Sequence, residues 1–296
     1  MNYELIVDAR NATGESPVWD VAEQALYWVD IPAGQLHRWT AADSAHQSWQ
    51  APQMLACIAR SANGSWIAGM EDGVYALTAN AQGKLDSRLL SAVEHGAEGM
   101  RFNDGRCDRQ GRFWAGSMLM NMQQAAPLGA LYRYDGEGRP LHLQLELEQM
   151  IVPNGLAFSP DGSRMYLSDS HPDVQRIWQF DYDVDTGTPH NQRLFVDMRG
   201  FPGRPDGAAV DADGCYWICG NDAGQVHRFT PDGRLDRSLN VPVKKPAMCA
   251  FGGRNLDTLF VTSIRPGGDL HDQPLAGGVF ALDAGVQGLP ETAWRS

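Results

Sequence analysis

The stretch that decides the fold is residues 101–118, RFNDGRCDRQGRFWAGSM. It combines an Arg-x-Asn-Asp-Gly cluster, a DRQG turn and a short apolar segment, RFWAGS, at residues 112–117. The same order of parts recurs along the chain. We therefore interpret this stretch as one unit of a repeat that carries polar residues at its front edge.

The repeat is clearest in six strand-like segments that begin 40 to 52 residues apart. They are ALYWVD from residue 25, SWIAGM from 65, RFWAGS from 112, RMYLSD from 164, CYWICG from 215 and TLFVTS from 258. A second apolar segment follows each one, and a segment rich in small residues precedes it. This period is typical of a four-stranded propeller blade, so we predict an all-β, six-bladed β-propeller that forms a single domain over residues 1–296.

The two ends of the chain are expected to meet in one blade. Residues 3–7, YELIV, read as a strand without a turn partner of their own, and the last repeated segment ends near residue 282. We expect the N-terminal strand to complete the sixth blade, because closing the ring leaves only short, protected sheet edges.

The period also locates candidate site residues. Counting back nine or ten residues from each repeated segment reaches one equivalent position in every unit: Glu15, Leu55, Asn103, Asn154, Asp206 and Met248. Four of these six side chains carry oxygen. If the innermost strands all run the same way along the axis, those four converge at one mouth of the central tunnel.

Two carboxylates and two amide oxygens confined together require a compensating cation, because like charges removed from water repel strongly. The absence of His and Cys from this set favours Ca, Mg or Mn, although Zn or Fe(II) can occupy such a site. We therefore predict one divalent metal cation. The alternative is that Asn and Asp before Gly only form turns, but four oxygen-bearing residues in one register argue against it.

Several motifs in the same order resemble the signature segments of the SMP-30/gluconolactonase/regucalcin family. They are GESPVW at residues 14–19, RFNDG at 101–105, PNGLAFSPDG at 153–162, PDG at 205–207 and GGVF at 277–280. The resemblance extends from about residue 4 to about residue 283. It implies a six-bladed propeller that hydrolyses sugar lactones with one divalent metal.

The resemblance also implies roles for single residues. Glu15, Asn154 and Asp206 would be the metal ligands, and Asp206 would also be the catalytic base. Asn103 would lie close to metal and substrate, and Arg101 would reach the oxygens of the substrate.

One loop departs from the pattern of some animal members, which carry acidic residues that touch the sugar. Here the loop at residues 117–124, SMLMNMQQ, has no acidic residue, and Asn121 stands near the expected acidic position. Asn121 and Arg204 are therefore candidate substrate-binding residues, with Arg204 adding positive charge near the mouth. An acidic sugar lactone, such as one derived from an aldaric acid, is a candidate beside neutral aldonolactones.

Bulk properties exclude several function classes. The formal net charge of −12 argues against binding nucleic acid or anionic membranes. The first ten residues, MNYELIVDAR, lack the basic start and long apolar run of a signal peptide, so we expect a cytoplasmic protein, either a monomer or a small homo-oligomer. Cys215 and Cys219 lie too far apart on one strand to form a disulfide, which fits a reducing compartment.

The sequence therefore predicts metal-assisted hydrolysis of a small-molecule sugar lactone. No dinucleotide fingerprint or phosphate loop implies an organic cofactor, and SDSH at residues 168–171 lacks the context of a serine-hydrolase elbow. Two alternatives stay open. One is a phosphotriesterase or fluorophosphatase using the same metal site, and the other is a non-catalytic propeller in which the metal only stabilises the tunnel.

Overall fold

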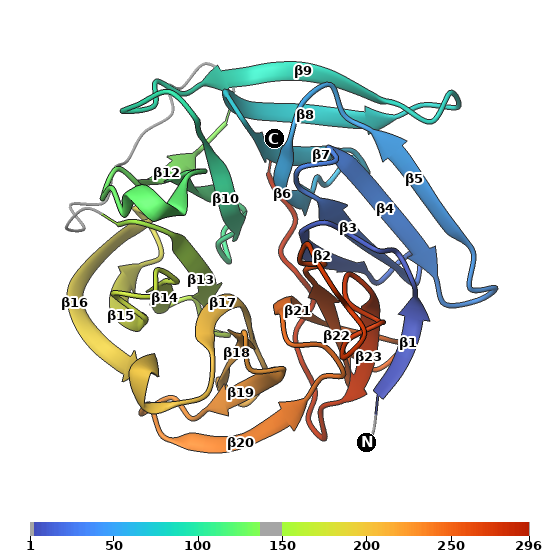
Figure 1. Cartoon of the computed structure of the whole chain (residues 1–296). Coiled ribbons are helices and arrows are strands. Elements are labelled where there is room, and N and C mark those ends of the chain that lie inside the picture. The colour runs from blue at the N-terminus through green and yellow to red at the C-terminus, as the bar shows by residue number, and fades with distance from the viewer. Residues whose placement is uncertain (1–2, 137–149, 296) are drawn as a thin grey trace.

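Six antiparallel sheets form a ring around a central axis in the computed structural model, which describes residues 3–136 and 150–295 (Figure 1). The all-β, six-bladed propeller predicted from the repeat is confirmed. Two 3₁₀ turns, η1 (Met122–Gln124) and η2 (Met198–Gly200), are the helical elements of the described residues, and no helix there is long and apolar enough to cross a membrane.

The blades follow one another in chain order. Blade 1 contains β2 (Gly14–Asp20), β3 (Ala25–Asp30), β4 (Gln35–Thr40) and β5 (His46–Gln50), and blade 2 contains β6 (Leu55–Arg60), β7 (Trp66–Met70), β8 (Gly73–Ala79) and β9 (Leu85–Ala92). In the described part of blade 3 there are β10 (Met100–Cys107), β11 (Phe113–Leu119) and β12 (Leu131–Tyr134). Blade 4 contains β13 (Pro153–Phe158), β14 (Arg164–Asp169), β15 (Arg176–Asp183) and β16 (Thr188–Asp197). Blade 5 contains β17 (Arg204–Val210), β18 (Tyr216–Asn221), β19 (Gln225–Phe229) and β20 (Leu235–Asn240).

Blade 6 joins the two ends of the chain. Its order is β1-β23-β22-β21, where β1 is Tyr3–Val7, β21 is Pro246–Gly252, β22 is Thr258–Ser263 and β23 is Val279–Asp283. Tyr3 pairs with Leu282 and Leu5 with Phe280. The predicted closure is therefore confirmed, with the N-terminal strand as the outermost strand of the last blade.

The hydrophobic core is divided among the gaps between blades. Each of six buried clusters draws its side chains mainly from two neighbouring blades, and the sixth joins blade 6 to blade 1. Between blades 3 and 4, for example, the Trp114 ring lies 6.5 Å from that of Phe158, and Trp114 is fully buried. Large aromatic rings suit these wedge-shaped gaps because they bury much apolar area per residue.

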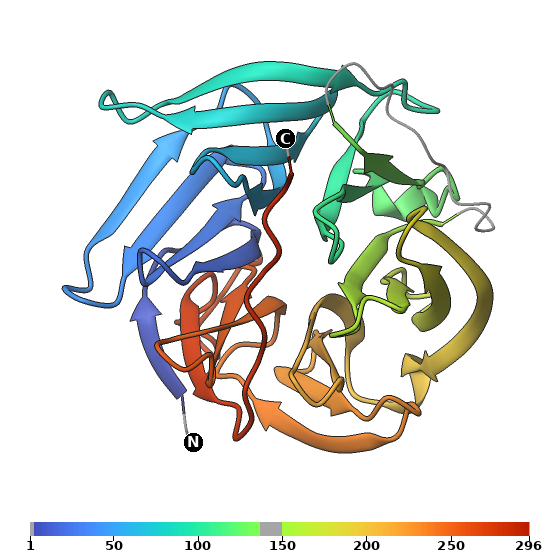
Figure 2. The same cartoon turned by 180° about the vertical axis from the view of Figure 1, so that it is seen from behind.

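The C-terminal tail crosses the back of the ring (Figure 2). It forms isolated bridges from Gly288 to Asp211 on blade 5 and from Trp294 to Ser61 beside blade 2, and Trp294 packs into the core between blades 2 and 3. The five cysteines are free and buried, so Cys215 and Cys219 form no disulfide with each other, as their spacing predicts.

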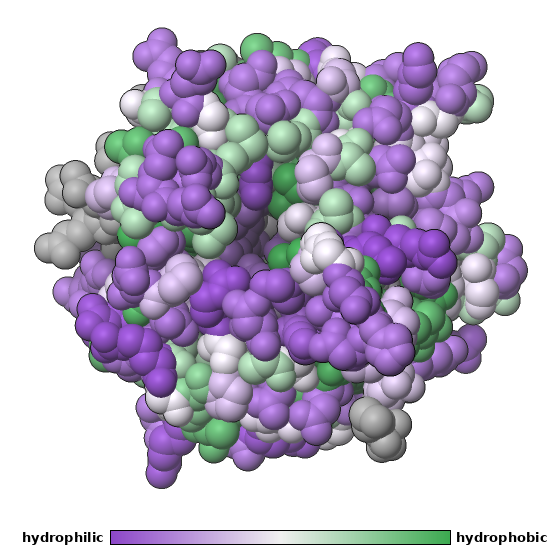
Figure 3. Space-filling model, viewed as in Figure 1, coloured by the Kyte–Doolittle hydropathy of each residue, from purple (hydrophilic) through white to green (hydrophobic). Residues whose placement is uncertain are grey.

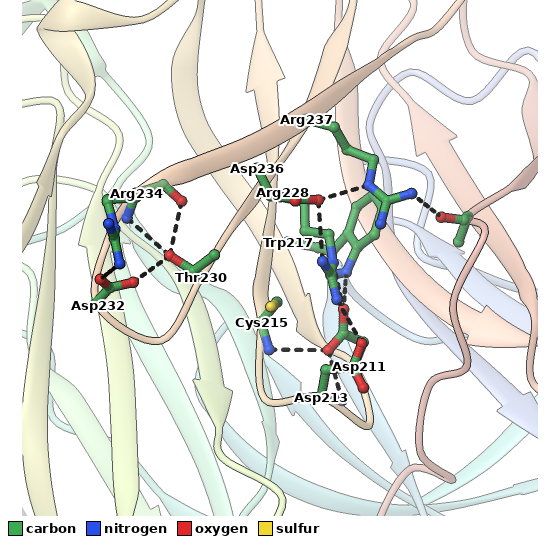
Figure 4. Close-up of polar contacts among 11 residues, drawn as sticks. Asp211, Asp213, Cys215, Trp217, Arg228, Thr230, Asp232, Arg234, Asp236 and Arg237 are labelled. Carbon is green, nitrogen blue, oxygen red and sulfur yellow. Dashed lines mark hydrogen bonds and ion pairs between the residues drawn. The ribbon is translucent and has the colours of Figure 1, made fainter.

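Turns between the first and second strands of a blade are held by buried aspartates. Asp211 is fully buried; its Oδ1 accepts hydrogen bonds from the amides of Asp213 and Cys215, each at 3.0 Å. Its Oδ2 accepts from Trp217 Nε1 and Arg228 Nε, both at 2.8 Å (Figure 4). Asp108 in the DRQG turn of blade 3 accepts the same pair of turn amides, so this device is a repeated structural feature.

Replacing Asp211 with Ala is predicted to destabilise the fold strongly. Arg228 keeps Asp213 and Asp236 as partners, but two turn amides and Trp217 Nε1 lose their buried acceptor, and each such unsatisfied donor costs roughly 1–3 kcal/mol. The free energy of unfolding in urea measures this. Asp232→Ala is the matched control, because Asp232 holds an exposed turn with Thr230 and Arg234 (Figure 4); it should change stability little. Equal losses in the two variants would contradict the assignment of Asp211.

Candidate functional site

A polar cavity of about 170 Å³ opens at one end of the central tunnel. Figure 3 shows the hollow near the centre of a mostly hydrophilic face, opposite the face that the tail crosses. Five blades contribute its lining: Thr13, Glu15, Arg101, Asn103, Met118, Met122, Val152, Asn154, Ser170, Arg204, Asp206, Asn221 and Ile264. The cavity thus brings together Glu15, Asn103, Asn154 and Asp206, which are far apart in sequence, with both candidate arginines.

A break in strand pairing accompanies each of these positions. The register of β2 shifts between Glu15 and Val18, that of β13 between Asn154 and Ala157, and that of β17 between Pro205 and Ala208. Bulges of this kind re-aim side chains and terminate pairing beside functional sites.

The residue after the polar side chain is left-handed in two of these bulges. Ser16, which follows Glu15, has φ 50°, and Gly155, which follows Asn154, has φ 62°. Ser16 is held there because its hydroxyl accepts a hydrogen bond from Ile58 N at 2.9 Å. The strained backbone is thus maintained by neighbouring blades.

Hydrogen bonds fix the two asparagines. Arg101 Nη1 donates to Asn103 Oδ1 at 2.9 Å, and Asn103 Nδ2 donates to Asn154 Oδ1 at 3.1 Å. Asn154 Nδ2 in turn donates to Ser170 Oγ at 3.0 Å, and that hydroxyl donates to the carbonyl of Pro205. This chain of donors sets the orientation of the Asn154 amide, whose Oδ1 keeps a second lone pair.

A second chain of donors holds Asp206. Asn221 Nδ2 donates to Asp206 Oδ2 at 2.6 Å, while Arg204 Nη2 donates to Asn221 Oδ1 at 3.4 Å. Arg204 also donates to the carbonyl of Ser170 at 3.1 Å and pairs with Asp222 at 2.7 Å. Within the described part of the chain, Asp206 Oδ1 accepts no hydrogen bond, so one carboxylate oxygen is available to the cavity.

Burial and like charge raise the pKa of both carboxyls. The pKa of Glu15 is raised well above its ordinary value, first by burial and then by the charges of Asp206 and Asp104. Burial raises the pKa of Asp206 to about 7, against the lowering effect of Arg204 and Asn221. Burial lowers the pKa of Arg101 to about 10, so this side chain stays charged at neutral pH. The site therefore holds negative charge that its own arginines do not fully stabilise.

The donor set fits a hard divalent cation. Two carboxylates and one amide oxygen, each from a side chain less than a tenth exposed, match the oxygen ligands that such cations take. A cation would also relieve the charge repulsion that raises the two pKa values. Among residues 3–136 and 150–295, no group of three His, Cys, Asp or Glu side chains could hold a metal ion, so a metal here would depend on the Asn154 amide as well.

Asn121 lies apart from the other candidate residues. It is exposed, it does not line the cavity, and its Oδ1 accepts a hydrogen bond from Gln123 N at 3.2 Å as the cap of η1. The same loop turns Met118 and Met122 toward the cavity instead. His171 from blade 4 lies 3.4 Å from the Met122 carbonyl and so supports this loop.

Sequence reasoning missed Ser170 and Asn221 as site residues. Ser170 and His171 lie in the SDSH segment. Ser170 accepts a hydrogen bond from Asn154, and His171 contacts the Met122 carbonyl. Asn221 pairs across the sheet with Arg204, so the register of the β17–β18 hairpin was the signal that could have identified it.

Comparison with known proteins places this geometry in context. A model of the SMP-30/gluconolactonase/LRE-like region matches residues 13–265. The 6-deoxy-6-sulfogluconolactonase of Pseudomonas putida is 42% identical over 98% of both chains. The pentonolactonase of Haloferax volcanii is 30% identical over 98% of this chain and 97% of its own. A solved structure of regucalcin from Agrobacterium tumefaciens, described as a calcium-binding protein, superposes with a TM-score of 0.90 at 28% identity, covering 100% of this chain and 98% of that one.

Gly155→Ala is predicted to be more destabilising than a typical left-handed glycine substitution. An added Cβ would lie 2.5 Å from Tyr216 Oη and 2.7 Å from Ser168 Oγ. The conformation alone costs roughly 1–3 kcal/mol for a non-glycine residue. Gly83 offers the control, because its φ is 73° but nothing lies within 4 Å of its added Cβ. Chemical denaturation of both variants should show the larger loss for Gly155→Ala, and equal losses would contradict the packing argument.

The stability of the protein without divalent cations should fall as the pH rises from about 4 to about 8. The folded-state pKa of Asp206, about 7, lies above the ordinary value of 3.8, so the folded protein binds more protons than the unfolded chain in this interval. This contribution is fully present below the ordinary pKa and is lost as the pH passes the folded-state pKa, and Glu15 acts in the same direction.

Unfolding measured against pH in chelator, for the wild type and for Asp206→Asn, isolates the effect. The difference in unfolding free energy between the wild type and Asp206→Asn should change as the pH rises from about 4 to about 8. Parallel curves would show that Asp206 titrates normally in the folded protein.

Proposed function

The chain belongs to the SMP-30/gluconolactonase/LRE-like family, and from this premise we propose that it hydrolyses the ester bond of a sugar lactone with the help of one divalent cation. The family resemblance inferred from the motifs is confirmed. Its relatives named as lactonases are carboxylic-ester hydrolases, and this chain is assigned to the same enzyme class. The observation that carries the proposal is the meeting of Glu15, Asn154 and Asp206 with Arg101 in one cavity.

Glu15, Asn154 and Asp206 are proposed to hold the cation. Regucalcin from Agrobacterium tumefaciens, which superposes closely, is described as calcium-binding, and that description supports a divalent ion. When bound, the ion would supply positive charge that polarises the lactone carbonyl. Calcium, magnesium, manganese, zinc and iron(II) are the candidates.

Asp206 is proposed as the base. Its Oδ1 faces the cavity while Asn221 fixes its Oδ2, so the carboxylate is oriented to take a proton from an attacking water. The water oxygen bonds to the carbonyl carbon, the ring C–O bond breaks, and the ring oxygen leaves as a hydroxyl after receiving the proton that Asp206 took from the water. The product is the open-chain sugar acid.

Arg101 and Asn103 are proposed to position the substrate. Arg101 uses Nη1 for Asn103 and for the Phe102 carbonyl at 2.6 Å, so the rest of its guanidinium remains available to substrate oxygens. Because Asn103 is bonded to both Arg101 and Asn154, it links the substrate contact to the candidate metal ligands. Arg204 lines the cavity from blade 5, and Arg101 lines it from blade 3. Asn121 caps η1, so it stays a candidate substrate contact only if its loop moves on binding.

The test is acid release from a panel of aldonolactones and aldarolactones, measured with a pH indicator and corrected for spontaneous opening. Protein stripped of metal should be inactive, and restoring one of the five candidate cations should start turnover. Asp206→Asn should lower kcat by roughly 10²-fold or more, because it loses both a base and a metal ligand.

The matched control is Asp232→Asn in an exposed turn of blade 5, where the side chain is 55% exposed. It removes one negative charge without touching the cavity, so its kcat should equal that of the wild type. Lactone turnover that is independent of metal, or release of fluoride or phenol from organophosphates without lactone turnover, would overturn the proposal.

A further inference from the structure

We infer that the preferred lactone carries an anionic substituent, a carboxylate, sulfonate or phosphate, on the end remote from the ring ester. Arg204 forms the subsite for it, and Lys245 supports Arg204 by sharing its partner Asp222. The inference rests on the proposed lactonase function and names the substrate class of that same cavity. It is carried by three features of the described residues, each of which involves Arg204: the cationic cluster at the rim, the hydrogen-bond polarity of the walls, and the charge of the lining.

The rim cluster is built around one shared carboxylate. Asp222 pairs with Arg204 Nε through Oδ2 and with Lys245 Nζ through Oδ1. Two cations therefore share one anion, and the cluster keeps a net positive charge. Arg204 is only 20% exposed and lines the cavity, so its positive charge is directed into a partly desolvated space where it acts more strongly than in bulk water.

The cavity walls are rich in donors and poor in free acceptors. Arg101 and Arg204 line the walls, and Arg204, which donates to Asp222 and to the Ser170 carbonyl, keeps one further N–H on each of Nη1 and Nη2. The carboxylates among the described lining residues are Glu15 and Asp206, which are proposed to hold the cation. A neutral sugar needs acceptors for its hydroxyl protons as well as donors for its oxygens. A carboxylate, sulfonate or phosphate only accepts hydrogen bonds, so it matches a donor-rich wall.

The loop over blade 3 adds no acidic group to this wall. Met118 and Met122 face the cavity from that loop, and Asn121 caps η1 instead. Val152 and Ile264 extend the apolar lining. Among the described residues that line this side of the cavity, none carries an acidic side chain that would repel an anion.

The charge of the lining points the same way. Arg101, Arg204 and Lys245 equal Glu15, Asp206 and Asp222 in number, so a divalent cation would leave two positive charges in excess around the cavity. An anionic substituent on the substrate compensates part of this excess, whereas a neutral lactone leaves all of it.

The test compares gluconolactone with derivatives of the same ring size that carry a carboxylate, a sulfonate or a phosphate at the terminal carbon. The wild-type holoenzyme should prefer at least one anionic form, with kcat/KM roughly tenfold or more above that of the neutral lactone. Comparing kcat/KM among the three anionic lactones shows which substituent the subsite prefers.

Variants locate the subsite. Arg204→Gln should reduce the ratio of anionic to neutral kcat/KM by roughly tenfold, mainly through KM for the anionic form. The ratio is the readout because Arg204 also contacts Asn221 and so affects every substrate through Asp206. Lys245→Gln, which does not contact Asn221, should reduce the ratio by about two- to threefold.

Arg234→Gln is the charge-matched control, because Arg234 lies on blade 5 with its side chain 82% exposed and pairs only with the nearby Asp232. Its ratio should equal that of the wild type. A wild-type enzyme that hydrolyses the neutral lactone as well as all three anionic forms overturns the inference while leaving the lactonase assignment intact. An unchanged ratio in Arg204→Gln overturns the subsite. Absence of turnover with every lactone instead removes the proposed function itself.

Discussion

Negative charge buried at one end of the tunnel is the constraint on which the rest of the structure depends. Glu15 and Asp206 enter the same cavity from opposite parts of the chain, and Asp104 lies close enough to raise the pKa of both. Such a cluster is unfavourable in a low-dielectric interior unless positive charge and hydrogen-bond donors surround it. Arg101, Arg204 and the asparagine amides supply part of that compensation, and a cation would supply the remainder.

The unfavourable free energy of this charge cluster is offset by apolar packing at six blade interfaces. Each interface has its own buried apolar cluster, and blade 6 is closed by pairing between β1 and β23. Bonds between neighbouring innermost strands then hold the strained bulges, as when Leu156 N donates to Asp104 Oδ2 at 2.8 Å from the adjacent blade. Rigid strands, rather than loops, thus position the polar groups that need the greatest accuracy.

The sequence predicted the architecture because apolar segments recur at blade spacing, and it located the four axial polar positions because one period fixes one place in every blade. It could not predict partners that depend on strand register or on a neighbouring loop. Asn221 reaches Asp206 only because β18 pairs with β17 in a particular register. The side chain of Asn121 turns into its own 3₁₀ cap, a choice between local hydrogen bonds that residue identity alone does not determine. The path of the tail could not be predicted from the sequence, because the tail has no periodicity and depends on two isolated bridges.

The tail also determines how ligands reach the site. It crosses the rear of the ring (Figure 2). The spaces beside Arg106 there are only about 10 Å³ each, room for a water molecule but not for a sugar. Under the proposed function, substrate and product would then use the same mouth. Opening a lactone creates a carboxylate, so the product is more negative than the substrate, and an unmoderated cationic mouth would retain it. Asp222, which is 43% exposed and shared by Arg204 and Lys245, offsets one of these two positive charges, and under the proposed function this would favour release of the acid.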